Sequence, residues 1–293
     1  MSLLHALSFD VEEYFQVANL RHRFARADWD GVPSRLEPAM ASILAALARH
    51  RARATFFFLG WIAERHPRLV ARCLEDGHEV ASHGYEHLFL GDLGPEALER
   101  DLERTELALE RAGAPRPLGF RASTFTLTRS TWWAFDVLAR RGYRYDSSVF
   151  PVRHPVYGVP DFPPGISRVE TAAGSVIEFP VATWPFLGRN LPFGGGGYFR
   201  LLPGALTRAA LAGLERRGRP AACYLHPWEF DPDQPRESAP PFKRFRHYVS
   251  LHRTLPRLEA MLARFRFAGL AEVLEDQGYG PMSATVGSAS SQG

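Results

Sequence analysis

The stretch Ser8-Phe9-Asp10-Val11-Glu12-Glu13-Tyr14-Phe15 follows an apolar segment that begins at Leu3. Residues 3–10 are mostly apolar, which predicts a buried strand with acidic residues at its carboxyl end. Side chains on an extended strand alternate between two faces, so we expect Asp10 and Glu12 on one side and Val11 on the other. In α/β folds the carboxyl ends of the strands meet at the active site. The stretch therefore predicts an α/β fold with carboxylates at its functional end.

Helical and strand-like segments alternate along the chain after this first strand. Apolar spacing predicts helices at 38–49, 62–75, 95–112 and 129–141, and short apolar segments predict strands at 54–59, 78–82, 117–121 and 143–146. This order is typical of a mainly parallel sheet or barrel with helices outside it.

The second half of the chain contains a segment rich in proline and glycine, residues 151–203. We expect an elaborated loop region there, with a hairpin near 166–180. The fold would be completed by a helix at 204–217, a strand at 221–226, a helix at 244–264 and a last strand near 270–274. Barrels of this class commonly have this size, so we expect one domain over 1–280 and a disordered tail over 281–293.

Composition limits the classes of function. The chain has 293 residues, and its 35 basic and 32 acidic side chains are dispersed, giving a formal charge of +3. That balance does not favour a nucleic acid partner. No apolar run approaches the roughly 20 residues that cross a bilayer, so we expect no stable membrane insertion. No export signal is visible at the amino terminus and the chain has only two cysteines, which favours a cytoplasmic location.

A histidine pair follows the strand expected at 78–82. In Ser82-His83-Gly84-Tyr85-Glu86-His87 the two imidazoles are four residues apart, so a helical or tight turn would let one ion share them. Two histidines and one carboxylate form a ligand set suited to zinc or another divalent ion. The alternative is that both are ordinary surface or partly buried histidines, since this spacing often arises by chance.

Three further polar residues come at strand ends. Arg121 follows one strand, where it could pair with an acid, and a surface arginine is the alternative. His226 follows a late strand, where an imidazole could protonate a leaving group, and a core histidine is the alternative. Asp146 ends another strand and could hydrogen-bond His226 and raise its pKa.

Over residues 3–275 these clusters resemble, in order, the polysaccharide deacetylases of the NodB-homology type, also called carbohydrate esterase family 4. Three phrases are similar to the branch encoded with exopolysaccharide biosynthesis and exosortase loci: Phe9–Phe15, Gly195–Arg200 and His226–Pro232. The resemblance implies a distorted (β/α) barrel of about seven strands with its site at the strands' carboxyl ends.

The resemblance also implies roles for individual residues. Asp10 would be the general base, and Arg121 would orient it. His226 would be the general acid, supported by Asp146. His83 and His87 would be metal ligands, and the Thr124 main-chain N–H would be an oxyanion donor. The family's usual second aspartate is replaced by Val11. Glu12 is therefore our choice for the third metal ligand, and Glu13 should point away.

The activity implied is metal-dependent removal of N-acetyl groups from amino sugars of a polysaccharide or its precursor, in exopolysaccharide biosynthesis. Zinc is the first choice of ion, and an N-acetylated glycan is the expected substrate. Val11 favours a second hypothesis, a metal-independent amidohydrolase acting on cyclic amides, against which the histidine pair argues. A third is a catalytically silent glycan-binding protein, although binding alone needs neither a base nor an acid.

Overall fold

Strand β1 (Leu4–Val11) lies within a nine-stranded sheet, and all eight of its residues are buried. The computed structural model describes residues 2–154 and 156–282. On one edge β1 pairs in parallel with β10 (Ala222–Leu225). On its other edge it pairs, also in parallel, with β2 (Thr55–Phe58) and β11 (Arg266–Ala268). The acidic end of the first strand is thus enclosed by neighbours on both sides.

The sheet continues from β2 and curls into a distorted barrel. Its further strands are β3 (Glu79–Ser82), β4 (Gly119–Phe120), β5 (Tyr145–Asp146) and β7 (Gly174–Glu178), all parallel, and β6 (Ser167–Thr171), antiparallel to β7. After β7 the chain bridges the gap to β10. Val181 N–H donates to the Val149 carbonyl at 3.1 Å, and Ala182 N–H donates to the Ala222 carbonyl at 2.9 Å. The predicted α/β class and NodB-like distorted barrel are confirmed.

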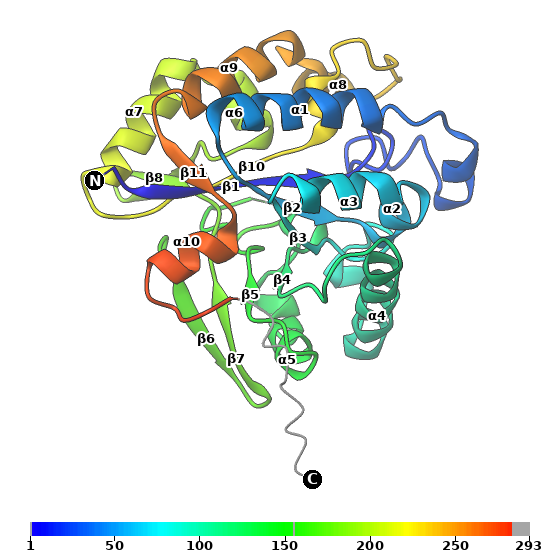
Figure 1. Cartoon of the computed structure of the whole chain (residues 1–293), viewed down its shortest axis with the longest axis horizontal. Coiled ribbons are helices and arrows are strands. Elements are labelled where there is room, and N and C mark those ends of the chain that lie inside the picture. Colours follow the sequence, from blue (N-terminus) through cyan, green and yellow to red (C-terminus); the bar gives the residue numbers. More distant parts are fainter. Residues whose placement is uncertain (1, 155, 283–293) are drawn as a thin grey trace.

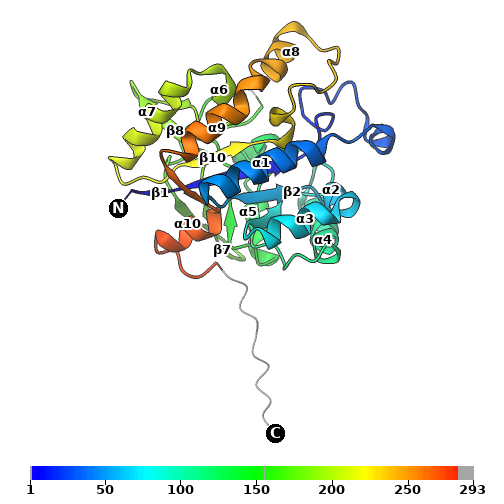
Figure 2. The same ribbon diagram turned by 45° about the horizontal axis from the view of Figure 1, so that its top comes forward.

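Helices surround this sheet, and Figures 1 and 2 both show α1 and α9 side by side across β1 and β10. The helices are α1 (Leu36–His50), α2 (Gly60–Arg65), α3 (Pro67–Glu75), α4 (Pro95–Arg111), α5 (Ala134–Arg140), α6 (Gly196–Leu201), α7 (Gly204–Glu215), α8 (Pro241–Tyr248), α9 (Thr254–Leu262) and α10 (Leu270–Asp276). A separate hairpin of β8 (Thr183–Phe186) and β9 (Arg189–Pro192) belongs to the elaborated region.

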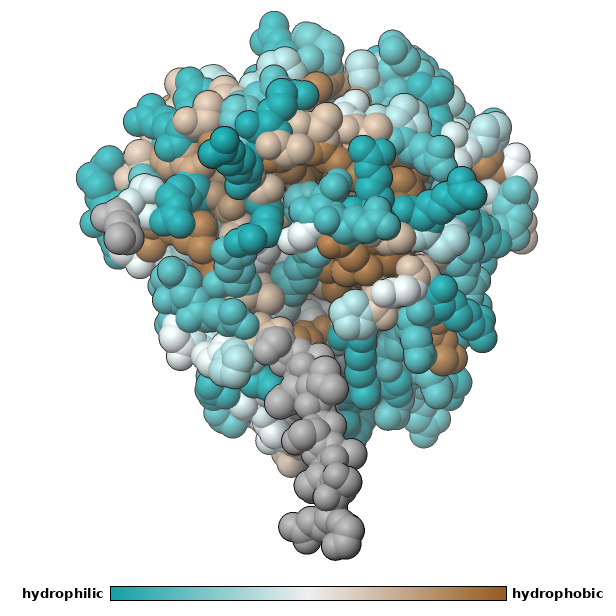
Figure 3. Space-filling view, viewed as in Figure 1, coloured by the Kyte–Doolittle hydropathy of each residue, from teal (hydrophilic) through white to brown (hydrophobic). Residues whose placement is uncertain are grey.

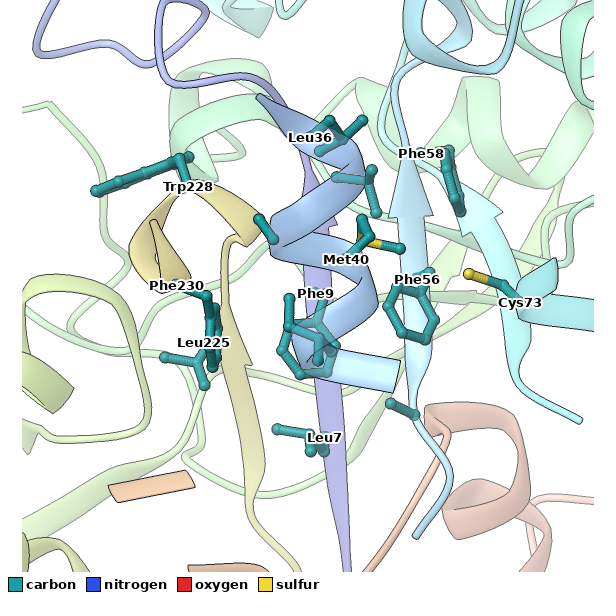
Figure 4. Packing of buried hydrophobic residues seen from close by; sticks show 14 of the residues in the cluster. Leu7, Phe9, Leu36, Met40, Phe56, Phe58, Cys73, Leu225, Trp228 and Phe230 are labelled. Carbon is teal, nitrogen blue, oxygen red and sulfur yellow. The ribbon is translucent and has the colours of Figure 1, made fainter. Parts of the chain in front are cut away.

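The largest core cluster fixes the carboxyl end of β1. Figure 4 shows side chains of α1, β1, β2 and β10 gathered there. Phe9, Met40 and Phe56 are fully buried, and the Phe9 and Phe56 rings stack with centroids 5.1 Å apart. Each such side chain contributes about 1.5–3 kcal/mol through burial. Polar side chains that follow these strands therefore project from a rigid base.

Several predicted elements need correction. The strand expected near 270–274 is wrong, because those residues lie in helix α10, which begins after Gly269. The strand, β11, ends just before this glycine. The helix expected over 244–264 is divided into α8 and α9, with Ser250 at a φ of 53° between them. The helix expected at 62–75 is interrupted before Pro67, which starts α3 and cannot continue a preceding helix. The hairpin expected near 166–180 is confirmed.

One face of the molecule is mainly polar, and the described chain ends at a buried residue. Figure 3 shows polar side chains over most of this face, with smaller apolar areas between them. No helix in the described part of the chain is long and apolar enough to cross a bilayer. Met282, within the segment expected to be a disordered tail, is buried. Residues 283–293 of that segment lie outside the described residues.

Candidate metal-binding active site

One pocket at the strands' carboxyl ends brings most of the predicted site residues together. It is lined by Asp10, Glu12, His83, His87, Thr124 and His226, among others. Val11 lies in the hydrophobic core, as strand alternation requires. Glu13 points away, because its carboxylate accepts hydrogen bonds from the Ser34 hydroxyl and the Arg35 N–H.

Glu12, His83 and His87 each offer a ligand atom, and the three atoms lie within 4.8 Å of one another. Glu12 Oε2 lies 2.8 Å from His87 Nε2. This buried oxygen has no well-oriented hydrogen-bond partner in the part of the chain that the structure describes. Two lone-pair atoms that meet in this way suit a shared cation, since zinc holds nitrogen and oxygen ligands at about 2.0–2.2 Å. The residues therefore fit a divalent ion.

Neighbouring groups hold these ligands in the form that binds metal. His83 Nδ1 lies 2.8 Å from the Arg121 carbonyl oxygen, which places the proton on Nδ1 and leaves Nε2 free. Burial lowers the pKa of His83 to about 4, which keeps the imidazole neutral. Burial alone would raise the pKa of Glu12, but the adjacent imidazoles, first of all His87, lower it to about 2. A neutral imidazole and an ionised carboxylate are the forms that coordinate.

A carboxylate on α4 supports the turn between the two histidines. Asp101 Oδ2 accepts a hydrogen bond from the Tyr85 N–H at 2.9 Å. Gly84 lies beside it with a φ of 75°, where an added Cβ would be 2.8 Å from the same oxygen. His87 has a φ of 55°, so the turn needs this external support. Sequence reasoning missed Asp101, because no local pattern connects α4 to this turn.

Asp10 and Arg121 form a buried ion pair. Arg121 Nη1 donates to Asp10 Oδ1 at 2.7 Å. The other guanidinium contacts are with Ser8 Oγ at 2.7 Å and with the carbonyl and hydroxyl of Ser147 at 2.9 and 2.8 Å. Arg121 is fully buried. These contacts fix the guanidinium, which in turn orients the Asp10 carboxylate toward the pocket.

His226 faces Asp10 across the pocket and is supported by Glu229. Its Nε2 lies 3.9 Å from Asp10 Oδ2, and its Nδ1 lies 2.6 Å from Glu229 Oε1. Glu229 Oε2 accepts a hydrogen bond from Arg200 Nε at 2.5 Å. Burial lowers the pKa of His226, but the hydrogen bond to Glu229 and the charges of Glu12, Glu229 and Asp10 outweigh it and raise the pKa to about 9. His226 is therefore protonated near neutral pH, as a general acid requires.

The expected support of His226 by Asp146 is wrong. Asp146 accepts hydrogen bonds from the hydroxyl and N–H of Ser148, at 2.6 and 2.9 Å, and pairs with Glu178. Burial raises the pKa of both carboxyls in this pair. Glu229 takes the place beside His226 because a 3₁₀ turn at Pro227–Phe230 brings residues three apart together. The spacing in His226-Pro227-Trp228-Glu229 was the available signal.

Trp228 and Thr124 complete the site. Trp228 Nε1 donates to Glu12 Oε1 at 3.1 Å, a contact that the sequence analysis missed. Thr124 has a φ of 54° within a short 3₁₀ turn at Ser123–Phe125 and lies at the pocket. Its main-chain N–H stays a predicted oxyanion donor.

The fold and the pocket define an α/β protein with a candidate metal site at the carboxyl ends of its parallel strands. Residues 28–145 match the polysaccharide deacetylase family, and residues 147–275 match a domain of unknown function, DUF3473. Each match covers less than half of the chain, so the first segment is similar to the polysaccharide deacetylases and the second to the domain of unknown function.

Curated relatives are similar to this chain over part of their length. A 98-residue segment is 39% identical to a chitooligosaccharide deacetylase of Rhizobium leguminosarum bv. trifolii, covering 33% of this chain and 43% of the relative. A 60-residue segment is 38% identical to a peptidoglycan-N-acetylglucosamine deacetylase of Bacillus cereus, covering 20% and 28%. The matches thus span less than half the length of these curated relatives.

Solved structures share the fold over almost the whole chain. A Mycobacterium smegmatis structure described as a polysaccharide deacetylase superposes with a TM-score of 0.62 at 19% identity, covering 96% of this chain and 94% of the other. A CE4 family pseudoenzyme from Bacillus anthracis gives 0.50 at 13% identity, covering 93% and 66%. Because the fold also occurs in a pseudoenzyme, activity has to be argued from the site.

Proposed function

We propose that this protein is a metal-dependent hydrolase that removes N-acetyl groups from amino sugars of a polysaccharide or its precursor, in exopolysaccharide biosynthesis. The observation that carries the proposal is the convergence of Glu12, His83 and His87 in one pocket with a carboxylate, Asp10, and an imidazole, His226. Names of the relatives support the substrate class, since they are described as deacetylases of chitooligosaccharide and of peptidoglycan N-acetylglucosamine.

The proposed reaction adds water to the acetamide carbonyl. A divalent ion at Glu12, His83 and His87, with zinc as the first choice, would act as a Lewis acid toward this carbonyl and lower the pKa of water. Asp10, oriented by Arg121, takes the proton of the attacking water. The Thr124 N–H donates to the oxygen on which negative charge develops.

The second half of the reaction breaks the carbon–nitrogen bond. His226 donates its proton to the departing nitrogen, so that acetate and a free amine are formed. Glu229 stabilises the imidazolium before the transfer and fixes its orientation through Nδ1. Arg200 holds Glu229 in place with a buried ion pair. A proposed proton acceptor, Asp10, and a proposed proton donor, His226, thus line the same pocket.

Two observations favour this proposal over the alternatives. A metal-free amidohydrolase has no need for two histidines and a carboxylate aimed at one point. A silent glycan-binding protein has no need for an acid supported by a buried Arg200–Glu229 pair, because binding requires no proton donor and burying two charges costs free energy. The expected cytoplasmic location stays a prediction, which cell fractionation with specific antibodies can test.

The test combines metal content with acetate release. We expect about one divalent ion per chain and chelator-sensitive acetate release from N-acetylated chitooligosaccharides. Glu12→Gln should lose both, whereas Glu13→Gln, which alters the adjacent carboxylate on the opposite face, should retain the ion. Circular dichroism of each variant checks folding. A native protein without metal after reconstitution, or acetate release that resists chelation, would overturn the metal-dependent reaction.

A further inference from the structure

A second cavity opens beside the candidate active site. It has a volume of about 650 Å³, within the range of ligand pockets. The residues that line both cavities are Ala18, Asn19, Thr124, Tyr157 and Arg246. Because these residues line both spaces, the second cavity lies next to the place proposed for the N-acetyl group.

The second cavity is positively charged. Its basic lining residues are Arg21, His22, His154, Lys243 and Arg246, and its described lining includes no aspartate or glutamate. Arg21 pairs with Asp92 at 3.1 Å. Among the described residues, neither Lys243 nor Arg246 forms an ion pair with a carboxylate at 4.0 Å or less. Burial, and secondly the charge of Arg246, lower the pKa of His154, so the positive charge of the cavity comes from its arginines and its lysine.

Aromatic side chains complete the walls of this cavity. Phe89, Tyr157 and Phe242 line it, and Phe242 is 73% exposed. Figure 2 shows helix α8, which carries Phe242, at the periphery of the molecule. Flat rings of this kind offer apolar contact area to the C–H face of a sugar. The cavity therefore combines surfaces for a sugar ring with cations that lack an internal partner.

We propose that this second cavity binds an anionic group of the substrate, a carboxylate on a neighbouring sugar or a phosphate on a carrier, with Lys243 and Arg246 as its cations. The two side chains are three residues apart on α8 and therefore project from the same side of the helix. The inference rests on the proposed function and narrows its substrate to a negatively charged N-acetylated glycan.

Helix α8 offers a matched control for this proposal. Arg244, next to Lys243, lines a different cavity together with Arg236, Phe245 and Tyr248. Both Lys243 and Arg244 are exposed, so charge reversal at either position leaves the core intact. Lys243→Glu and Arg244→Glu change the net charge equally. They differ in the cavity that they affect.

The experiment measures binding by calorimetry on the full chain. One pair of probes is a hyaluronan hexasaccharide, in which N-acetylglucosamine alternates with glucuronate, and the same fragment after reduction of its carboxylates. The other pair is N-acetylglucosamine 1-phosphate and N-acetylglucosamine. We expect the charged member of at least one pair to bind about threefold tighter or more. The pair that shows the difference identifies the source of the anion.

The two variants and added salt then test whether the preference for the charged probe arises in the second cavity. Lys243→Glu should abolish the preference and Arg244→Glu should retain it, and 0.5 M NaCl should weaken it because salt screens exposed charges. Equal binding of both members of both pairs, absent binding included, would overturn the proposal. An equal loss in the two variants would also overturn it. Acetate release from chitooligosaccharides, measured separately, tests the deacetylase itself, so its failure is distinguishable from failure of the anion site.

Discussion

The carbonyl oxygen of Arg121 lies 2.8 Å from Nδ1 of His83, and the guanidinium of the same arginine lies 2.7 Å from Asp10. Arg121 thus contacts one proposed metal ligand through its main chain and the proposed base through its side chain. The two contacts are separable by mutation, because a substitution changes only the side chain.

We expect Arg121→Lys to lower kcat by about 10²-fold, because a misplaced base is costly in rate. Lysine cannot reproduce the contacts with Asp10, Ser8 and Ser147 together. The metal content should stay close to that of the native protein, since the carbonyl that orients His83 remains. Steady-state acetate release and elemental analysis measure the two effects, and Arg129→Lys at the surface serves as control. Loss of metal in parallel with activity would contradict this division.

Glu229→Gln should lower kcat about tenfold or more with little change in KM, because the variant weakens the support of His226. The pKa of His226, raised to about 9 in the native protein, should fall. A general acid works only while protonated, so the loss of activity at high pH should begin at lower pH in the variant. The pH profile of kcat provides the measurement, with Glu237→Gln as the control. An unchanged profile would show that Glu229 has no part in proton transfer.

Trp228→Phe should weaken metal affinity about tenfold, since it removes the Nε1–H donor to Glu12 and keeps an aromatic ring. Contacts behind metal ligands orient them, and Glu12 Oε1 would lose its donor. Competition with a fluorescent chelator gives the affinity. Trp132→Phe, in a separate core cluster, controls for loss of an indole. Equal affinity in all three proteins would argue against an orienting role for Trp228.

Acid should destabilise the fold partly through His5, a fully buried residue far from the pocket. Burial lowers its pKa to about 4, and its Nδ1 accepts a hydrogen bond from the Ala221 N–H. The unfolded chain takes up this proton near pH 6.5, so stability falls as the pH drops from about 6.5 to about 4, by about 3 kcal/mol. Urea unfolding should show a smaller loss between pH 7 and pH 4.5 in His5→Gln than in the native protein. His252→Gln, at an exposed position, should behave like the native protein.

The first strand and the positions of Asp10 and Glu12 could be predicted because they depend on local periodicity. Alternation along a strand decides which side chains share a face, and parallel strands place their carboxyl ends together. The same rule predicted that Val11 would be buried and that Glu13 would point away, as the structure shows. The alternation of helices and strands was sufficient for the α/β class.

Contacts between distant segments could not be predicted in this way. The contact of Glu229 with His226 is local and had a signal in the spacing, but the position of Asp146, away from His226 and beside Ser148 and Glu178, depends on how the sheet curls. Asp101 reaches the histidine turn from another helix, and Arg200 reaches Glu229 from the elaborated region. The sequence by itself determined that Asp10, Arg121 and His226 lie at or next to the carboxyl ends of strands, because backbone geometry is local. Only the tertiary structure decided which of them touch, because that depends on packing between segments far apart in the chain.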